Sequence, residues 1–269
     1  MTIMKIYISA DIEGTTGIAH WDEADRTKTD YQEFRSQMTA EVKAACEGAN
    51  QAGAKEILIK DAHESGRNLI VSELPENIKI IREWSGHPFS MMQGIDDSFD
   101  AAVFTGYHSR AGSDTNTLAH TLREDYMYIK INGCYASEFL INAYTAAYVE
   151  VPVVMVTGDR GLCEEAKKIN PNITTVAVNE GEGSSTISIH PTKAVKKIKS
   201  TAKKALSGNF SKCKLQLPSK FEIEILFKDS RKAYKNSFYP NVEMPDVSTI
   251  IYQCEDYFDI LRFLSFTLH

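Results

Sequence analysis

The sequence predicts an α/β fold: a layered α/β/α sandwich with a mostly parallel sheet, plus a smaller C-terminal α+β subdomain. Strand and helix patterns alternate through the first 180 residues, which is typical of parallel sheets with right-handed crossovers. Val151–Val156 is a continuous apolar run, as expected for a strand buried on both faces. Phe221–Phe227 alternates strictly, which indicates a different sheet in the tail. We therefore divide the chain into residues 1–189 and 190–269.

The first half begins with a short apolar strand at Lys5–Ala10. A helix follows from Tyr31, because apolar residues recur there at spacings of three and four. Thr29 or Asp30 can cap this helix, and Gly53 ends it. Further strands are expected at Glu56–Lys60, Ile78–Arg82 and Ala101–Thr105.

The second half continues the alternation and then changes character. The Asn132-Gly133 pair is a turn signal that closes a strand. The polar stretch Glu180–Ser185 is expected to be flexible, and the six lysines of the following helix are expected to form its solvated face. The aromatic residues Phe258, Phe263 and Phe266 of the last helix are expected in the core. The expected strands are Asp125–Ile131, Thr174–Val178 and Thr249–Gln253, and the expected helices are Ala136–Val149, Cys163–Ile169, Pro191–Leu206 and Tyr257–Leu268.

Composition excludes several classes of protein. The 269 residues carry 30 Lys and Arg against 36 Asp and Glu, a net charge of −6, so we expect no nucleic-acid partner. No run approaches the roughly 20 apolar residues of a membrane helix, and the start lacks the features of a signal peptide. We therefore expect a cytoplasmic protein without a membrane partner. Five scattered cysteines without a C-x-x-C pair argue against disulfides and against a thiolate metal site.

Ionisable side chains gather where the predicted strands end, and ligands of open α/β sheets bind at the carboxyl ends of the strands. Asp11 and Glu13 follow the first strand, His63 the second, and His108 the strand at Ala101. Glu138 opens the helix after the Asn-Gly turn. Each residue taken singly is ordinary for a loop or a helix cap, but one sheet edge collects all of them. Oxygen and imidazole ligands of this kind suit Zn²⁺, with Mn²⁺ or Co²⁺ as alternatives.

These motifs, in this order, resemble the zinc-dependent D-aminopeptidases encoded with dipeptide transport systems. The resemblance runs from about residue 5 to residue 178 and continues more weakly into the tail. The matching segments are Ser9-Ala-Asp11-Ile-Glu13-Gly14, Lys60-Asp61-Ala-His63, Pro88-Phe89-Ser90-Met91, Gly106-Tyr107-His108-Ser-Arg110, Ala136-Ser-Glu138, Asn142-Ala143-Tyr144, Val151-Pro152-Val153 and Met155-Val156-Thr157-Gly158-Asp159.

The resemblance implies a two-zinc site in which Asp11 bridges both metals. Glu13 and His63 would complete the first site, and His108 and Glu138 the second. His120 matches the residue that the family places beside the metals as the catalytic histidine. Residues 1–189 would then be the metal-binding catalytic domain, and residues 190–269 would close the substrate chamber or mediate assembly. The resemblance further implies short D-peptide substrates such as D-Ala-D-Ala and a homo-oligomer, a decameric ring.

Two other functions remain open from the residues alone. A dinuclear site of this composition also serves hydrolases of L-peptides, other amides or phosphoesters. In the other alternative, the chain is a non-catalytic peptide-binding protein with a structural metal. Structural zinc sites are usually closed and often contain cysteine, and no cysteine lies among these motifs. Asp61 and Arg110 flank the expected ligands and are candidates for orienting them.

Overall fold

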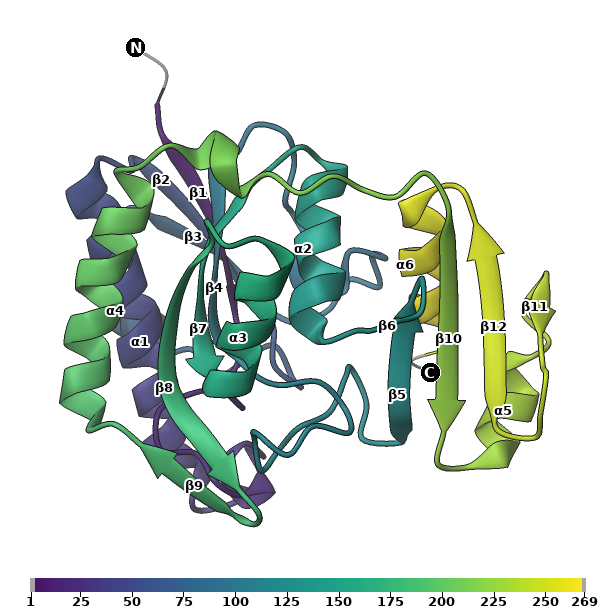
Figure 1. The fold of residues 1–269 in the computed structure, drawn as a ribbon. Helices are drawn as coiled ribbons and strands as arrows, with labels where there is room; N and C mark the ends of the chain where they lie inside the picture. Colours follow the sequence, from purple (N-terminus) through teal and green to yellow (C-terminus); the bar gives the residue numbers. More distant parts are fainter. Residues whose placement is uncertain (1–2, 268–269) are drawn as a thin grey trace.

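The computed structural model describes residues 3–267 and contains two β-sheets (Figure 1). The larger sheet has seven strands in the order β3-β2-β1-β4-β7-β8-β9. All neighbouring strands in it are parallel except β8 and β9, which form an antiparallel pair. Its strands are β1 (Lys5–Ala10), β2 (Glu56–Asp61), β3 (Ile78–Ile81), β4 (Ala101–Tyr107), β7 (Val153–Asp159), β8 (Thr174–Glu182) and β9 (Ser185–Ser188).

Helices cover both faces of this sheet, which confirms the predicted sandwich. Helices α1 (Tyr31–Ala52) and α4 (Pro191–Leu206) pack together on one face. Helices α2 (Glu138–Tyr148) and α3 (Arg160–Ile169) lie on the other. Gly53 ends α1 as predicted, because it adopts φ 106°, a left-handed conformation that disfavours other residues.

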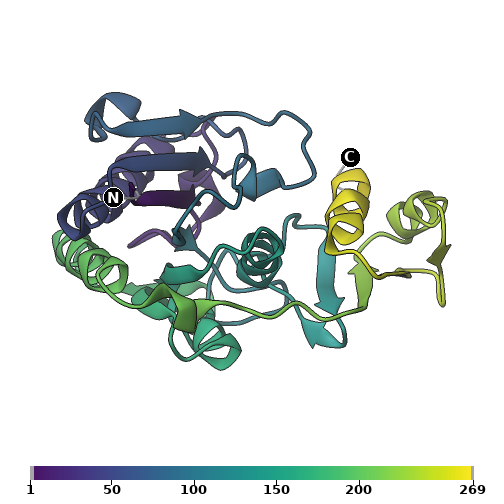
Figure 2. The same cartoon turned by 90° about the horizontal axis from the view of Figure 1, so that it is seen from above.

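The second sheet is antiparallel and has the order β11-β12-β10-β5-β6. Helix α6 (Tyr257–Thr267) packs on its central strands and also contacts α2, which lies between the two sheets (Figure 2). The alternate residues of β10 from Phe221 to Phe227 are buried, as the pattern predicts. The remaining elements are β5 (Tyr126–Ile131), β6 (Cys134–Tyr135), β10 (Phe221–Phe227), α5 (Ser230–Asn236), β11 (Val242–Glu243) and β12 (Thr249–Cys254).

The two sheets do not divide the chain at residue 190. Strands β5 and β6 precede that position, yet β5 pairs with β10, with Ile129 opposite Ile225. Conversely, α4 follows residue 190 but packs on α1 beside the larger sheet. The local pattern could not show either arrangement, because both depend on pairing between distant segments.

The polar stretch Glu180–Ser185 forms regular structure, whereas its composition indicates a flexible stretch. It forms the β8–β9 hairpin, in which Glu182 pairs with Ser185. The Asn179 side chain ties the hairpin to the loop after β1, since its amide donates to the Thr15 carbonyl and its oxygen accepts from the Gly17 N–H. These distant hydrogen bonds order a segment that looks mobile by composition.

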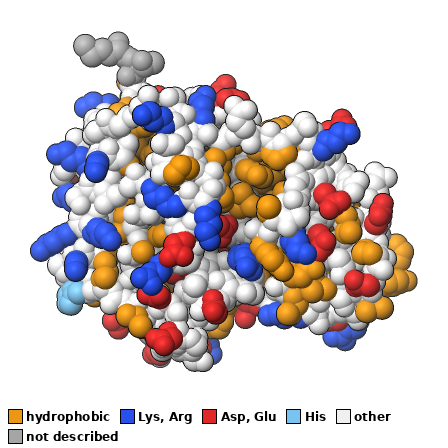
Figure 3. Space-filling view, viewed as in Figure 1, with side chains coloured by type: hydrophobic (Ala, Val, Ile, Leu, Met, Phe, Trp, Pro, Cys, Tyr) orange, Lys and Arg blue, Asp and Glu red, His pale blue; other side chains and the backbone are white. Residues whose placement is uncertain are grey.

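The lysines of α4 form a solvated face of this helix, as predicted. Five of the six α4 lysines are exposed, and basic side chains gather over this helix (Figure 3). Within residues 3–267, none of the helices combines the length and hydropathy that a membrane span requires. The predicted end of the last helix at Leu268 lies outside the described residues.

Candidate metal centre

Three neighbouring strands deliver the predicted ligands to one edge of the larger sheet. Asp11 directly follows β1, His63 comes two residues after β2, and His108 directly follows β4. Because the sheet order is β2-β1-β4, these three side chains meet above adjacent strands. Glu138 is the first residue of α2, where the Ser137 hydroxyl caps the helix by accepting from the Leu140 N–H. The cluster is therefore built on rigid elements.

Two glycines allow the loop after β1 to approach the end of β4. The Gly14 N–H donates to the Gly106 carbonyl at 2.8 Å. A Cβ atom at Gly14 would lie 1.8 Å from the Tyr107 carbonyl oxygen. Gly106 adopts φ +66°, and a Cβ there would lie 2.2 Å from the Asp11 carbonyl oxygen. The close approach carries Asp11 to the neighbourhood of His108.

Among the described residues, the donor atoms form three groups of three. Two of these triads share Asp11, and the third joins Glu13 and His108 to His120. In the first, His63 Nδ1 lies 3.0 Å from Glu13 Oε1 and 3.5 Å from Asp11 Oδ1. In the second, His108 Nε2 lies 3.6 Å from Asp11 Oδ2 and 3.5 Å from Glu138 Oε1. The two oxygens of Asp11 therefore face different triads, which is the arrangement a bridging carboxylate requires.

Backbone carbonyls set the tautomers of the histidines. His63 Nε2 lies 2.9 Å from the Ala24 carbonyl, and His108 Nδ1 lies 2.9 Å from the Ser109 carbonyl. A carbonyl only accepts, so these ring nitrogens carry the protons. The nitrogens that face the carboxylates therefore keep their lone pairs in the neutral rings. Lone pairs facing carboxylate oxygens repel unless a proton or a metal ion lies between them.

Because the carboxylates of the cluster are buried, they need a positive charge close to them. All five predicted ligands are at most 6% exposed. Within the described part of the chain, Asp11 Oδ2, Glu13 Oε2 and His108 Nε2 are buried without a hydrogen-bond partner. Buried polar atoms are normally paired, so three orphans in one cluster point to an ion.

The shifts in pKa have the same cause. Burial, and then the Glu13 carboxylate, raises the pKa of Asp11 well above its usual range. Burial opposes charge on His108, but Glu138 and the neighbouring carboxylates outweigh it and raise the pKa of His108 well above normal. Burial raises the pKa of Glu13, but the charge of His63 and its hydrogen bond outweigh burial, so the pKa lies well below its usual range. The cluster thus stabilises positive charge among its carboxylates.

The residues fit zinc. Bonds of about 2.0–2.2 Å in a tetrahedron place ligand atoms about 3.3–3.6 Å apart. The ion-pair distances in the two triads run from 3.0 to 3.6 Å. Each triad supplies three ligands of nitrogen and oxygen, and catalytic zinc sites use three protein ligands with one open position.

His120 lies beside both triads. Its Nε2 is 3.5 Å from Glu138 Oε1 and 3.9 Å from Glu13 Oε1, and its ring stacks on His108 with centroids 4.3 Å apart. Its Nδ1 donates to the Leu118 carbonyl, so Nε2 carries the lone pair. Burial, followed by the neighbouring His108, lowers the pKa of His120. The lowered pKa favours the neutral ring, which can accept a proton at Nε2.

Further residues hold the ligands in place. Asp61 accepts from the backbone N–H groups of Asn68 and Leu69, and the Asn68 amide donates both to Asp61 and to the His63 carbonyl. Asp61 thus reaches His63 only through Asn68. Sequence analysis missed Asn68, because only the path of the loop brings it back.

Arg110 does not orient a ligand directly, because its guanidinium lies over the Tyr135 ring. At the second triad, Asp159 acts on the backbone next to a ligand instead. It accepts from the backbone N–H and the hydroxyl of Ser109, next to His108. Asp159 ends one of the resembling segments, so a signal for it existed in the sequence.

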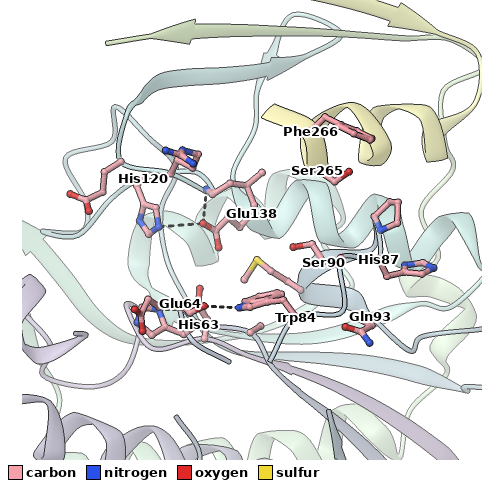
Figure 4. A pocket seen from close by; sticks show the side chains of 18 of the residues that line it. His63, Glu64, Trp84, His87, Ser90, Gln93, His120, Glu138, Ser265 and Phe266 are labelled. Atoms are coloured by element: carbon pink, nitrogen blue, oxygen red, sulfur yellow. Dashed lines mark hydrogen bonds and ion pairs between the residues drawn. The ribbon is translucent and has the colours of Figure 1, made fainter. Parts of the chain in front are cut away.

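The cluster opens into a cavity of about 870 Å³ (Figure 4). His63 and His120 line it, whereas His108 lies fully buried behind them. Its walls include Trp84 from the loop after β3 and Phe266 from α6. Phe266 is 62% exposed, so the expectation that it packs in the core is wrong. Sequence reasoning also missed Trp84, although it is one of only two tryptophans and the other, Trp21, lines the same cavity.

Comparison with known proteins agrees with this geometry. A family model described as D-aminopeptidase matches residues 4–266. A D-aminopeptidase of Bacillus subtilis (strain 168) is 33% identical over 257 residues, which cover 94% of this chain and 92% of the relative. The solved structure of the Zn-dependent D-aminopeptidase DppA from Bacillus subtilis, a self-compartmentalizing protease, superposes with a TM-score of 0.91 at 30% identity, covering 98% of this chain and 96% of that one. The chain therefore belongs to the D-aminopeptidase family.

Proposed function

We propose that this protein is a zinc-dependent aminopeptidase that hydrolyses short peptides with an N-terminal D-amino acid, such as D-Ala-D-Ala. The observation that carries the proposal is the pair of buried triads that share Asp11 on the wall of an open cavity. Family membership and the zinc dependence of the Bacillus subtilis neighbour support it.

Five residues would hold two zinc ions. Asp11, Glu13 and His63 would hold one, and Asp11, His108 and Glu138 the other. Zinc ions bound there would polarise the scissile carbonyl and lower the pKa of water toward neutrality. Asn68 and Asp159 would help to position these ligands, because they hydrogen-bond the backbone at His63 and next to His108.

His120 is the residue we propose to move the proton. Its neutral Nε2 faces the cavity side of the cluster and can accept a proton from the attacking water. The same atom then returns the proton to the leaving amine. The Leu118 carbonyl holds the ring by accepting from Nδ1–H, and Trp21 packs edge-on against it with centroids 5.2 Å apart.

The alternatives receive less support from the structure. A purely structural metal site would be closed, whereas this cluster lies on the wall of a large cavity. Free cationic side chains would favour a phosphoesterase, but two of the cavity cations, Arg123 and Lys232, are ion-paired with Asp125. Hydrolysis of a peptide bond thus agrees best with the site.

We also propose a cytoplasmic homo-oligomer, a closed decameric ring with the active sites inside. The description of the structural neighbour as self-compartmentalizing supports this assembly. So do large apolar side chains that the single chain leaves exposed, with Tyr234 at 61%, Phe238 at 71% and Val247 at 72%. Sedimentation of the purified protein tests it: a species near ten times the chain mass supports the ring, and a monomer contradicts it.

The proposed activity is tested by removing metal with a chelator, restoring zinc and measuring hydrolysis of D-Ala-D-Ala beside L-Ala-L-Ala. Cleavage of the D-dipeptide alone, lost with the metal and restored by zinc, is the expected result. Cleavage of the L-dipeptide alone would overturn the stereochemistry. Turnover of p-nitrophenyl phosphate without peptide hydrolysis would overturn the peptidase assignment.

A further inference from the structure

A lysine is buried three residues before His63. Lys60 is 0% exposed, although charged side chains are rarely fully buried unless they are paired. Over residues 3–267, no carboxylate lies within ion-pair distance of its ammonium group. Burying an ammonium without a counter-ion costs stability, so its other contacts must replace the lost hydration.

The ammonium group of Lys60 organises the loop that carries Trp84. It donates to the Asp61 carbonyl at 2.9 Å and to the Glu83 carbonyl at 2.7 Å. It also lies 3.9 Å from the centroid of the Trp84 ring, within the range of a cation–π interaction. Lys60 therefore links the end of β2 to the Trp84 ring and to the peptide before it.

Other contacts fix the same ring. The indole N–H of Trp84 donates to the Glu64 carbonyl at 2.6 Å, as Figure 4 shows. The Glu83 N–H donates to the Gly66 carbonyl, and a Cβ at Gly66 would lie 2.7 Å from the Glu83 nitrogen. Glu64 and Glu83 both adopt positive φ, 38° and 64°. Strained backbone of this kind persists where the surroundings impose it, often at ligand sites.

These contacts fix the Trp84 ring but leave part of it exposed. Trp84 is 40% exposed and lines the cavity together with His63 and Glu138. In Figure 4 the Trp84 side chain lies beside His63 and below Ser90 and Glu138. One face of the indole thus meets the buried lysine while the ring borders the space beside the metal centre.

We propose that Trp84 is a specificity-determining residue whose exposed ring surface binds an aromatic side chain of the peptide substrate, and that Lys60 is the positioning residue that holds the ring. The proposal rests on the proposed aminopeptidase function. It predicts a preference for a bulky aromatic residue next to the scissile bond over alanine. A stacked aromatic pair favours the aromatic peptide by about tenfold.

The first test compares three dipeptides, D-Ala-D-Ala, D-Phe-D-Ala and D-Ala-D-Phe, with the zinc-loaded protein. Trp84→Ala should lower kcat/KM for an aromatic dipeptide by about tenfold relative to D-Ala-D-Ala, mainly through KM, while Trp84→Phe keeps the preference. Tyr148→Ala, an exposed aromatic residue that is not in the cavity wall, is the control. Equal losses for all three dipeptides, or no loss, would overturn the proposal. A wild-type protein that cleaves none of them fails the proposed function instead.

The second test does not depend on activity. Trp21→Phe leaves Trp84 as the one tryptophan of the sequence, so its fluorescence reports on this ring alone. D-Phenylalanine should change the emission at concentrations where D-alanine does not, and equal responses would contradict the proposal.

Lys60→Met in this Trp21→Phe background should shorten the rotational correlation time of the ring and weaken the response to D-phenylalanine. Lys79→Met, an exposed lysine on β3, should change neither. A ring that stays equally immobile without Lys60 would refute its positioning role.

Discussion

Replacing Asn68 by alanine should damage both the fold and the metal centre. The Asn68 amide donates to Asp61 Oδ1 at 2.7 Å and to the His63 carbonyl at 2.7 Å, and its oxygen accepts from the Tyr31 hydroxyl at 2.7 Å. Alanine removes all three hydrogen bonds. Because Asp61 and Asn68 are fully buried, the partners left behind have no ready access to water.

The magnitude follows from these partners. A hydrogen bond to a carboxylate contributes about 1.5–3 kcal/mol, and each neutral buried partner left unpaired costs about 1 kcal/mol or more. Asn68→Ala should therefore lower the free energy of unfolding by about 4 kcal/mol. Loss of the bond to the His63 backbone should weaken zinc binding by about 10–100-fold, as is typical when an orienting residue is removed.

Urea unfolding and zinc competition with a chelator measure the two effects. Tyr31→Phe is the matched control, because it removes one of the three hydrogen bonds and leaves the amide on Asp61 and His63. It should cost about 1 kcal/mol and leave zinc affinity nearly unchanged. An Asn68→Ala protein that equals Tyr31→Phe in both assays would refute the reasoning.

Three further variants test other parts of the site. Burial lowers the pKa of Lys60 to about 8, so between pH 8 and about 10.4 the unfolded chain binds a proton that the folded protein lacks. The free energy of unfolding of the wild type should therefore rise with pH in this window by up to about 3 kcal/mol relative to that of Lys60→Met. Urea unfolding of both proteins at pH 7 and pH 10 measures this rise. A difference between the two proteins that is the same at both pH values would contradict the lowered pKa. His120→Ala should lower kcat by about 10²–10⁴-fold while elemental analysis still finds the wild-type zinc content, and loss of zinc would make it a ligand instead. Gly14→Ala should prevent the loop after β1 from closing on β4, since its Cβ would lie 1.8 Å from the Tyr107 carbonyl oxygen; a variant with normal zinc content and melting temperature would exclude this strain.

Local sequence patterns predicted the helices and strands whose buried face can be recognised within a single segment. The spacing of apolar residues in α1 and the alternation in β10 each show which face is buried, and both elements begin where expected. Pairing between distant segments was not predictable in this way. Nothing near β5 indicates β10 as its partner, and nothing within Glu180–Ser185 shows the tie made by Asn179.

The metal centre was more predictable than the cavity around it. Asp11, His63 and His108 follow parallel strands, and the carboxyl ends of parallel strands meet at one edge. Trp84 and Asn68 lie in loops whose paths depend on buried polar contacts, such as those of Lys60 and Asp61, that no periodicity reveals. The ligands were therefore accessible to sequence reasoning, whereas the residues that shape and orient the site needed the structure.

The central claim is that two zinc ions share Asp11 at this sheet edge. Anomalous diffraction at the zinc edge from crystals of the zinc-loaded protein tests it most directly. Two peaks are predicted, one among Asp11, Glu13 and His63 and the other among Asp11, His108 and Glu138. A single peak, or peaks away from Asp11, would contradict the claim.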